Sequence, residues 1–184
     1  MKKKILIISG GISKERAISL DTGKQVGKEL KKNGYQVKIC EPDYNLINVV
    51  KTFKPNTIFN ALHGQFGEDG YIQSILENIG TPYTHSGVVA SAQAMDKEIS
   101  KKIFIRNKIL TPKYLKYSFD KSKSELNHII KKKLSFPVVI KPINEGSSVN
   151  VFICNQSNIN KKLKLLKNYK EILIEQFIPG REIQ

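Results

Sequence analysis

Short apolar runs alternate with amphipathic segments through the first half of the chain. The apolar runs predict strands over residues 4–9, 35–40 and 57–62, and apolar positions at helical spacing predict helices over residues 15–32, 44–53 and 71–79. Strands that alternate with helices pair in parallel through right-handed crossovers, so this half is predicted to be an α/β domain. Ligands of such sheets bind at the carboxyl ends of the strands, where Gly10, Gly11, His63 and Gly64 lie.

The second half has a different pattern. Strands are predicted over residues 114–119, 136–141, 149–154 and 171–177, and helices over residues 96–107, 121–133 and 158–168. Only a short loop joins the second and third of these strands, which favours antiparallel pairing and an α+β unit. The run of small residues 86–94 ends just before Met95. We therefore predict two domains, residues 1–95 and 96–184.

Length and composition set the class of protein. The chain has 184 residues, 40% of them hydrophobic, which is enough for packed cores. No apolar run approaches the ~18 residues of a membrane span. Apolar residues 5–8 after the basic start are too few for a signal-peptide core of about 7–15 residues, so we expect a cytoplasmic protein. Cys40 and Cys154 lie far apart and lack metal-ligand spacing, so we interpret both as core residues.

The net charge of +15 raises the question of nucleic-acid binding. Residues 1–95 carry a net charge of +4 and residues 96–184 one of +11. Arg16, Arg106 and Arg181 are the only arginines, although proteins that read bases and phosphates usually favour arginine for its planar fork. Many lysines fall on the polar faces of predicted helices. We therefore expect no nucleic-acid partner, while the excess charge of the second half favours a small anionic ligand there.

Two glycines follow the first predicted strand, in the segment GGISKE. Glycine permits positive φ and close backbone approach, and the backbone N–H groups at a helix start bind anions. Ser13 is the predicted N-cap of the next helix. Glu15 suits the helix dipole, and it also points toward the strand ends, where it could bind a substrate ammonium. A plain turn is the alternative, because two glycines after a strand are weak evidence on their own. The segment is not the dinucleotide-binding motif, because the third glycine is missing.

The segment HGQFGEDG, residues 63–70, follows the third predicted strand. Its glycines indicate a tight loop whose polar groups face one point. A titratable histidine beside a carboxylate is a frequent pairing in functional sites. The alternative is a surface loop in which Asp69 caps the following helix.

Three features of the second half could bind a nucleotide. Lys97 opens a predicted helix, and the segment KPINEGSSVN, residues 141–150, follows a buried strand. Glu175 and Glu182 flank the end of the last predicted strand, where a carboxylate can accept from an adenine amino group or ribose hydroxyls. Taken singly, each of these residues could equally be a solvated surface residue.

Taken together, the motifs resemble the D-alanine–D-alanine ligases of the ATP-grasp superfamily. The segments that carry the resemblance are GGISKERAIS, ALHGQFGEDG, PYTHSGVVASAQAMDK, VIKPINEGSSV and ILIEQFIPGREI. They occur in the family's order and at its spacing over the whole chain. The resemblance implies an N-terminal Rossmann-like preATP-grasp domain and a central ATP-grasp subdomain. The implied reaction is the ATP-dependent formation of D-alanyl-D-alanine for peptidoglycan synthesis.

The resemblance also implies roles for individual residues. Glu15 would bind the amino group of the first D-alanine, with His63 beside it and Glu68 supporting both. Ser147 would join Glu15 in the closed site, and these two are the residues expected to act in catalysis. The residues expected to bind ATP are Lys97 and Lys141 at the phosphates, Glu145, Gly146, Ser147 and Ser148 in a loop over them, Glu175, Gln176, Phe177 and Ile178 at the adenine, and Glu182 at the ribose.

Two departures from the family pattern bear on the expected activity. Asn150 stands where glycine is usual, and asparagine tolerates positive φ better than most residues. The family's third domain, which supplies the Mg²⁺ ligands, is expected to be absent from the 184 residues. ATP and D-alanine are the expected ligands, no metal site is expected within this chain, and little activity is expected of it alone. A D-alanyl-D-lactate or D-alanyl-D-serine ligase, a non-catalytic binding fragment and a homodimer are left open.

Overall fold

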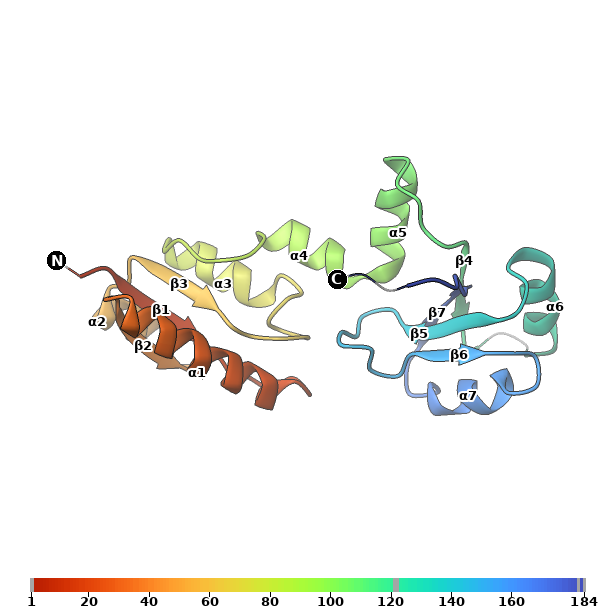
Figure 1. Cartoon of the computed structure of the whole chain (residues 1–184), viewed down its shortest axis with the longest axis horizontal. Coiled ribbons are helices and arrows are strands. Elements are labelled where there is room, and N and C mark those ends of the chain that lie inside the picture. The colour runs from red at the N-terminus through yellow and green to blue at the C-terminus, as the bar shows by residue number, and fades with distance from the viewer. Residues whose placement is uncertain (1, 121–122, 182, 184) are drawn as a thin grey trace. The chain divides into compact units, whose positions relative to one another are not determined.

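The computed structural model describes residues 2–120, 123–181 and 183, and it divides the chain into two compact units, Met1–Met95 and Asp96–Gln184 (Figure 1). Unit 1 has a parallel sheet and unit 2 an antiparallel one, so the predicted fold class is confirmed. Among the described residues, no helix combines the length and the apolar character needed to cross a membrane.

Unit 1 is built on three parallel strands in the order β2-β1-β3. The strands are β1 Lys4–Ile8, β2 Gln36–Cys40 and β3 Thr57–Asn60, and the helices are α1 Arg16–Lys32, α2 Leu46–Phe53, α3 Tyr71–Ile79 and α4 Val88–Met95. One sheet face, with Leu6, Ile8 and Ile58, packs against α2 and α3. On the other face α1 lies close through Gly23 and Gly27, where an added β-carbon would meet Ile7, Ser9 or Ile39. Helices therefore cover both faces, which leaves the carboxyl ends of the strands for a site.

Unit 2 contains four strands in the order β4-β7-β5-β6, and each neighbouring pair is antiparallel. The strands are β4 Tyr114–Ser118, β5 Val138–Pro142, β6 Phe152–Cys154 and β7 Glu171–Gln176, and the helices are α5 Lys97–Arg106, α6 Lys123–Lys133 and α7 Ile159–Leu165. The predicted antiparallel pairing of β5 with β6 is confirmed. One sheet face, including Ile140 and Ile174, forms the core together with α6 and α7.

The two cysteines are free. Cys154 is fully buried in the core of unit 2, as predicted, and Cys40 is half-buried against the core of unit 1. Burial raises the pKa of each thiol to about 11. Both thiols are therefore protonated at neutral pH and behave as small apolar side chains.

Candidate functional site

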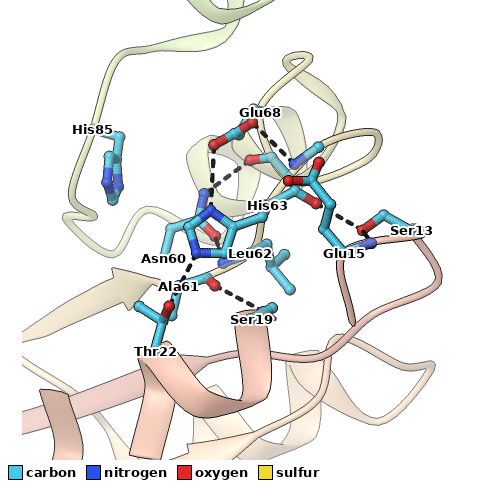
Figure 2. A network of polar contacts seen from close by, with 12 residues as sticks. Ser13, Glu15, Ser19, Thr22, Asn60, Ala61, Leu62, His63, Glu68 and His85 are labelled. Atoms are coloured by element: carbon cyan, nitrogen blue, oxygen red, sulfur yellow. Dashed lines mark hydrogen bonds and ion pairs between the residues drawn. The ribbon is translucent and has the colours of Figure 1, made fainter. Parts of the chain in front are cut away.

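The chain turns sharply after β1 and after β3, and a buried serine holds the two turns together. Gly10 and Gly11 have φ values of 90° and 78°. The Gly10 N–H donates to Ser19 Oγ at 2.7 Å, and that hydroxyl donates to the Ala61 carbonyl at 2.7 Å. Because Ser19 is fully buried, it satisfies two backbone groups that water does not reach. The site loops therefore start from fixed strand ends (Figure 2).

Ser13 links the first loop to the second instead of capping α1, so the N-cap prediction is wrong. The N-cap residue is Glu15, without a side-chain capping bond. Ser13 Oγ accepts from the Glu15 N–H at 3.1 Å and donates to the His63 carbonyl at 2.8 Å. The hydroxyl is thus used to join two loops that lie 50 residues apart in sequence.

Glu15 lies against the loop that follows β3. Gly64 has a φ of 70°, and a β-carbon added there would overlap Glu15 Oε2. Figure 2 shows Ser13, Glu15 and His63 in one network, in which Ser13 joins the Glu15 backbone to the His63 carbonyl. The structure therefore brings together the two residues expected to bind D-alanine within unit 1.

The imidazole of His63 is held on both sides. Its Nδ1 lies 3.6 Å from Glu68 Oε1, and its Nε2 is 3.1 Å from Thr22 Oγ1 (Figure 2). The second carboxylate oxygen of Glu68 accepts from the Gly64 N–H at 2.9 Å. Glu68 therefore orients the ring and the loop backbone together, which leaves the imidazole in one position.

The side chains of Asn60 and Asp69 hold the backbone of the loop after β3. The Asn60 side chain donates to the Gly67 carbonyl at 2.9 Å and accepts from the Leu62 N–H at 3.1 Å, which ends β3 at Asn60, earlier than predicted. Asp69 accepts from the Phe66 N–H at 2.8 Å and from the Tyr71 N–H at 3.1 Å. Asp69 is not the N-cap of α3, because that position belongs to Gly70, in the left-handed region.

A cleft of about 430 Å³ opens beside these loops, and residues that follow all three strands line it. They include Gly11, Ser13, Pro42, Tyr44, His63 and Phe66. Glu41 fixes its rim: the carboxylate accepts from the Gly11 N–H and from Arg16 Nε, both at 3.2 Å. The hydrogen bond from Arg16 lowers the pKa of Glu41, so this contact persists at neutral pH.

In unit 2, strand alternation places the candidate nucleotide residues on the sheet face away from the core. In the register of β5 and β7, Lys141 lies opposite Leu173 and Val139 lies opposite Glu175. Lys141 and Glu175 are therefore diagonal neighbours on one face of the sheet. Lys141 Nζ forms an ion pair with Glu175 Oε1. The other oxygen, Oε2, lies 2.8 Å from Lys101 Nζ, which comes from α5.

Lys97 reaches the same region from the start of α5. Asp96 caps this helix by accepting from the Ile99 N–H at 2.9 Å. Lys97 Nζ donates to the Ile143 carbonyl at 3.2 Å and to the Glu145 carbonyl. Burial lowers the pKa of Lys97, and the positive charge of Lys141 lowers it further.

The loop after β5 has a backbone that is rare for L-residues. Ser147, Ser148 and Asn150 have φ values of 44°, 57° and 58°, so Asn150 does adopt the left-handed conformation. The Tyr169 hydroxyl donates to Glu145 Oε1 at 2.8 Å and accepts from Asn150 Nδ2 at 2.9 Å. One tyrosine therefore ties both ends of the loop, with Gly146 and the two serines between them.

The remaining residues expected at the adenine follow Glu175. The Gln176 N–H donates to the Lys113 carbonyl at 2.9 Å and the Phe177 N–H to the Pro137 carbonyl at 3.2 Å, while Ile178 is exposed. Glu182, expected at the ribose, lies outside the described residues. Within the described part of the chain, no group of three or more His, Cys, Asp or Glu side chains could hold a metal ion.

Four polar residues of these regions were not predicted from sequence: Ser19, Thr22, Lys101 and Tyr169. Of these, Lys101 had a readable signal, since it lies one helical turn after Lys97 and therefore on the same face of α5. The other three make contacts up to 42 residues away along the chain, which no local pattern reveals.

Comparisons with known proteins agree with this arrangement. Residues 109–184 match the family model described as "D-ala D-ala ligase C-terminus". The chain is 71% identical over all of its 184 residues to a D-alanine–D-alanine ligase of Pelagibacter ubique (strain HTCC1062), and it covers 60% of that protein.

Two solved structures of the D-alanine–D-alanine ligase from Bacillus anthracis have the same fold. The first matches with a TM-score of 0.84 and 33% identity, over 97% of this chain and 58% of that one. The second, a complex with ATP, matches with a TM-score of 0.79 and 31% identity, over 97% of this chain and 60% of that one. The chain thus spans about 60% of the length of these relatives. Over its whole length the chain is similar to these D-alanine–D-alanine ligases in sequence and in fold.

Proposed function

We propose that the chain forms the D-alanine-binding and nucleotide-binding parts of an ATP-dependent D-alanine–D-alanine ligase. The observation that carries the proposal is that Lys97 donates to the Ile143 and Glu145 carbonyls, at the start of the loop that follows Lys141 and the end of β5. Lys97 and Lys141 repel each other, and the carboxylates of Glu145 and Glu175 offset part of that repulsion. A triphosphate would supply further negative charge beside both lysines.

The nucleotide phosphates would take the place of two backbone carbonyls as hydrogen-bond acceptors of Lys97. Lys97 now donates to two loop carbonyls, and phosphate oxygens would replace them as acceptors. The left-handed backbone at Ser147 and Ser148 is of the kind that turns successive N–H groups toward an anion. The serine hydroxyls and Gly146 would complete a donor-rich cover over the phosphates.

Adenine would lie at the end of β7, beside Glu175, Gln176, Phe177 and Ile178. Both oxygens of the Glu175 carboxylate already accept from lysines. Each carboxylate oxygen has two acceptor sites, so Glu175 can also accept from the exocyclic amino group. Glu182 is proposed at the ribose on the resemblance alone.

The first D-alanine would bind in unit 1. Its ammonium would pair with Glu15, and its carboxylate would lie near His63, whose ring Glu68 and Thr22 hold in place. The fixed loop contacts through Ser13 favour one orientation of the substrate.

The proposed chemistry has two steps. A carboxylate oxygen of the first D-alanine attacks the γ-phosphorus, and ADP leaves, which produces an acylphosphate. The amine of the second D-alanine then attacks the acyl carbon, inorganic phosphate leaves, and the amine loses a proton. Lys97 and Lys141 would stabilise the negative charge of the phosphates. Glu15, which holds the ammonium of the first D-alanine, and Ser147, in the loop over the phosphates, are the residues proposed to act in catalysis.

Mg²⁺ is proposed to accompany ATP, but the described residues do not form a metal site, so none of their proposed roles depends on it. We also propose a cytoplasmic location and a homodimer, with neither nucleic acid nor membrane as partner. D-alanine as the acceptor, in preference to D-lactate or D-serine, is likewise a proposal.

The 184-residue chain should bind ATP but should not catalyse the formation of D-alanyl-D-alanine. Because it spans about 60% of its relatives' length, we propose that it carries only part of the active site. The test is calorimetric titration with ATP, followed by phosphate release with ATP, Mg²⁺ and D-alanine. Absence of ATP binding would contradict the proposed nucleotide site. Turnover in the ordinary range of about 1–1000 per second would show instead that these residues suffice for catalysis.

A further inference from the structure

Lys101 is a buried lysine that no part of the proposed mechanism uses. It lies on α5, and only 5% of its surface is exposed. Its ammonium donates to Thr111 Oγ1 at 2.8 Å and to the Pro112 carbonyl at 2.9 Å, and lies 2.8 Å from Glu175 Oε2. Three acceptors match the three N–H donors of a lysine. The ammonium is therefore held in one place.

Glu175 lies between two ammonium groups. It is 7% exposed, and its two oxygens contact Lys101 and Lys141, one each. Lysine and glutamate are rarely buried unless they are paired, and here the pairing is uneven. Two positive charges and one negative charge leave the group of three with a net charge of +1.

The exposed fractions of the Lys101 and Lys141 side chains show on which lysine the net positive charge is accessible. The Lys101 side chain is 6% exposed and all its donors are used, whereas the Lys141 side chain is 21% exposed and pairs with Glu175. Lys141 is also the lysine close enough to Lys97 to lower its pKa. The uncompensated charge is therefore available on the side where Lys97 and the loop 145–150 lie.

We infer that Lys101 is a positioning residue of the nucleotide site. It fixes the Glu175 carboxylate and neutralises it, so that Lys141 is oriented by Glu175 and still presents a positive charge to the phosphates. This inference rests on the proposed function, because it takes a nucleotide phosphate as the ligand of Lys97 and Lys141.

Loss of Lys101 should change the charge of the nucleotide site, which loss of a purely structural lysine would not do. Without Lys101, Glu175 would pair with Lys141 alone, and the net charge of the group would fall from +1 to zero. The loss of affinity should then grow with the number of phosphates on the ligand, because the missing interaction is with phosphate charge. A lysine that only supports the fold would weaken binding of every adenine nucleotide by the same factor.

The test compares Lys101→Met with Lys102→Met in the 184-residue chain. Lys102, the next residue of α5, has a side chain that is 62% exposed and pairs with Glu98, so it is a matched control outside the site. Dissociation constants for ATP, ADP and AMP are measured by calorimetry. Lys101→Met should weaken ATP binding about tenfold, ADP about threefold and AMP less than about twofold. Lys102→Met should leave all three unchanged.

Lys101→Gln is a second variant, for use if the methionine variant does not fold. Glutamine keeps amide donors for Pro112 and Glu175 but carries no charge, so it should reproduce the graded loss even if the methionine variant does not fold. Equal factors for the three nucleotides, or no loss of ATP affinity, would overturn the inference while leaving nucleotide binding intact. A wild-type chain that binds none of the nucleotides would instead overturn the proposed function.

Discussion

Lys141→Ala should weaken ATP binding by roughly 30-fold. A hydrogen bond to a charged group contributes ~2 kcal/mol, and this ammonium would face several phosphate charges in a half-buried place. The fold should tolerate the change, because Glu175 keeps its contact with Lys101 at 2.8 Å. The measurement is the dissociation constant of ATP by calorimetry, with thermal unfolding followed in parallel.

Lys131→Ala is the matched control for this experiment. Lys131 lies in the last turn of α6 and is exposed, so its ammonium interacts mainly with water. Its removal should leave ATP affinity within about twofold of wild type. If the two alanine variants bind ATP alike, Lys141 does not contact the phosphates, and the loop after β5 is only a turn.

Gly64→Ala should weaken D-alanine binding by roughly 30-fold. A β-carbon at this position would overlap Glu15 Oε2 and displace the carboxylate proposed to hold the substrate ammonium. Loss of a charged hydrogen bond of ~2 kcal/mol accounts for the size of the effect. Binding is measured by chemical-shift titration with D-alanine.

Gly80→Ala separates backbone strain from displacement of Glu15. Gly80 has a φ of 76°, close to the 70° of Gly64, and an added β-carbon there meets nothing within 4 Å. Both variants should lose about 1–2 kcal/mol of stability, because both place alanine in the left-handed region. Only Gly64→Ala should lose D-alanine affinity. Equal D-alanine affinity in the two variants would remove Glu15 from the substrate site.

Strong local signals accounted for most of the fold. The helix predicted over residues 71–79 is α3, Tyr71–Ile79, because Gly70 and Gly80 both take the left-handed conformation at its ends. Where the local sequence pattern was weaker, the predicted elements were missed or misplaced. The helix α4 was missed because its many small residues give no clear apolar stripe. The strand predicted from residue 149 starts only at Phe152, because Asn150 is left-handed and the Val151 N–H bonds to the Ser148 carbonyl.

The candidate sites were only partly predictable. Residues such as Glu15, His63 and Lys141 stand at strand ends or in glycine-rich segments, so local pattern and family resemblance both point to them. The groups that orient them depend on tertiary packing. Ser19 bonds to a carbonyl 42 residues away, and the ion pair of Lys101 with Glu175 joins α5 to β7. The spacing of Lys101 from Lys97 indicates that both lie on one face of α5, but it does not show that Lys101 is buried and pairs with Glu175.

The most direct test of the nucleotide site is protection of individual lysines by ATP. The wild-type chain is reductively methylated with and without ATP, and the extent of modification at each lysine is measured by mass spectrometry. ATP should slow the modification of Lys97 and Lys141 and leave that of Lys131 unchanged. Modification of Lys97 and Lys141 at the same rate with and without saturating ATP would contradict the proposed nucleotide site.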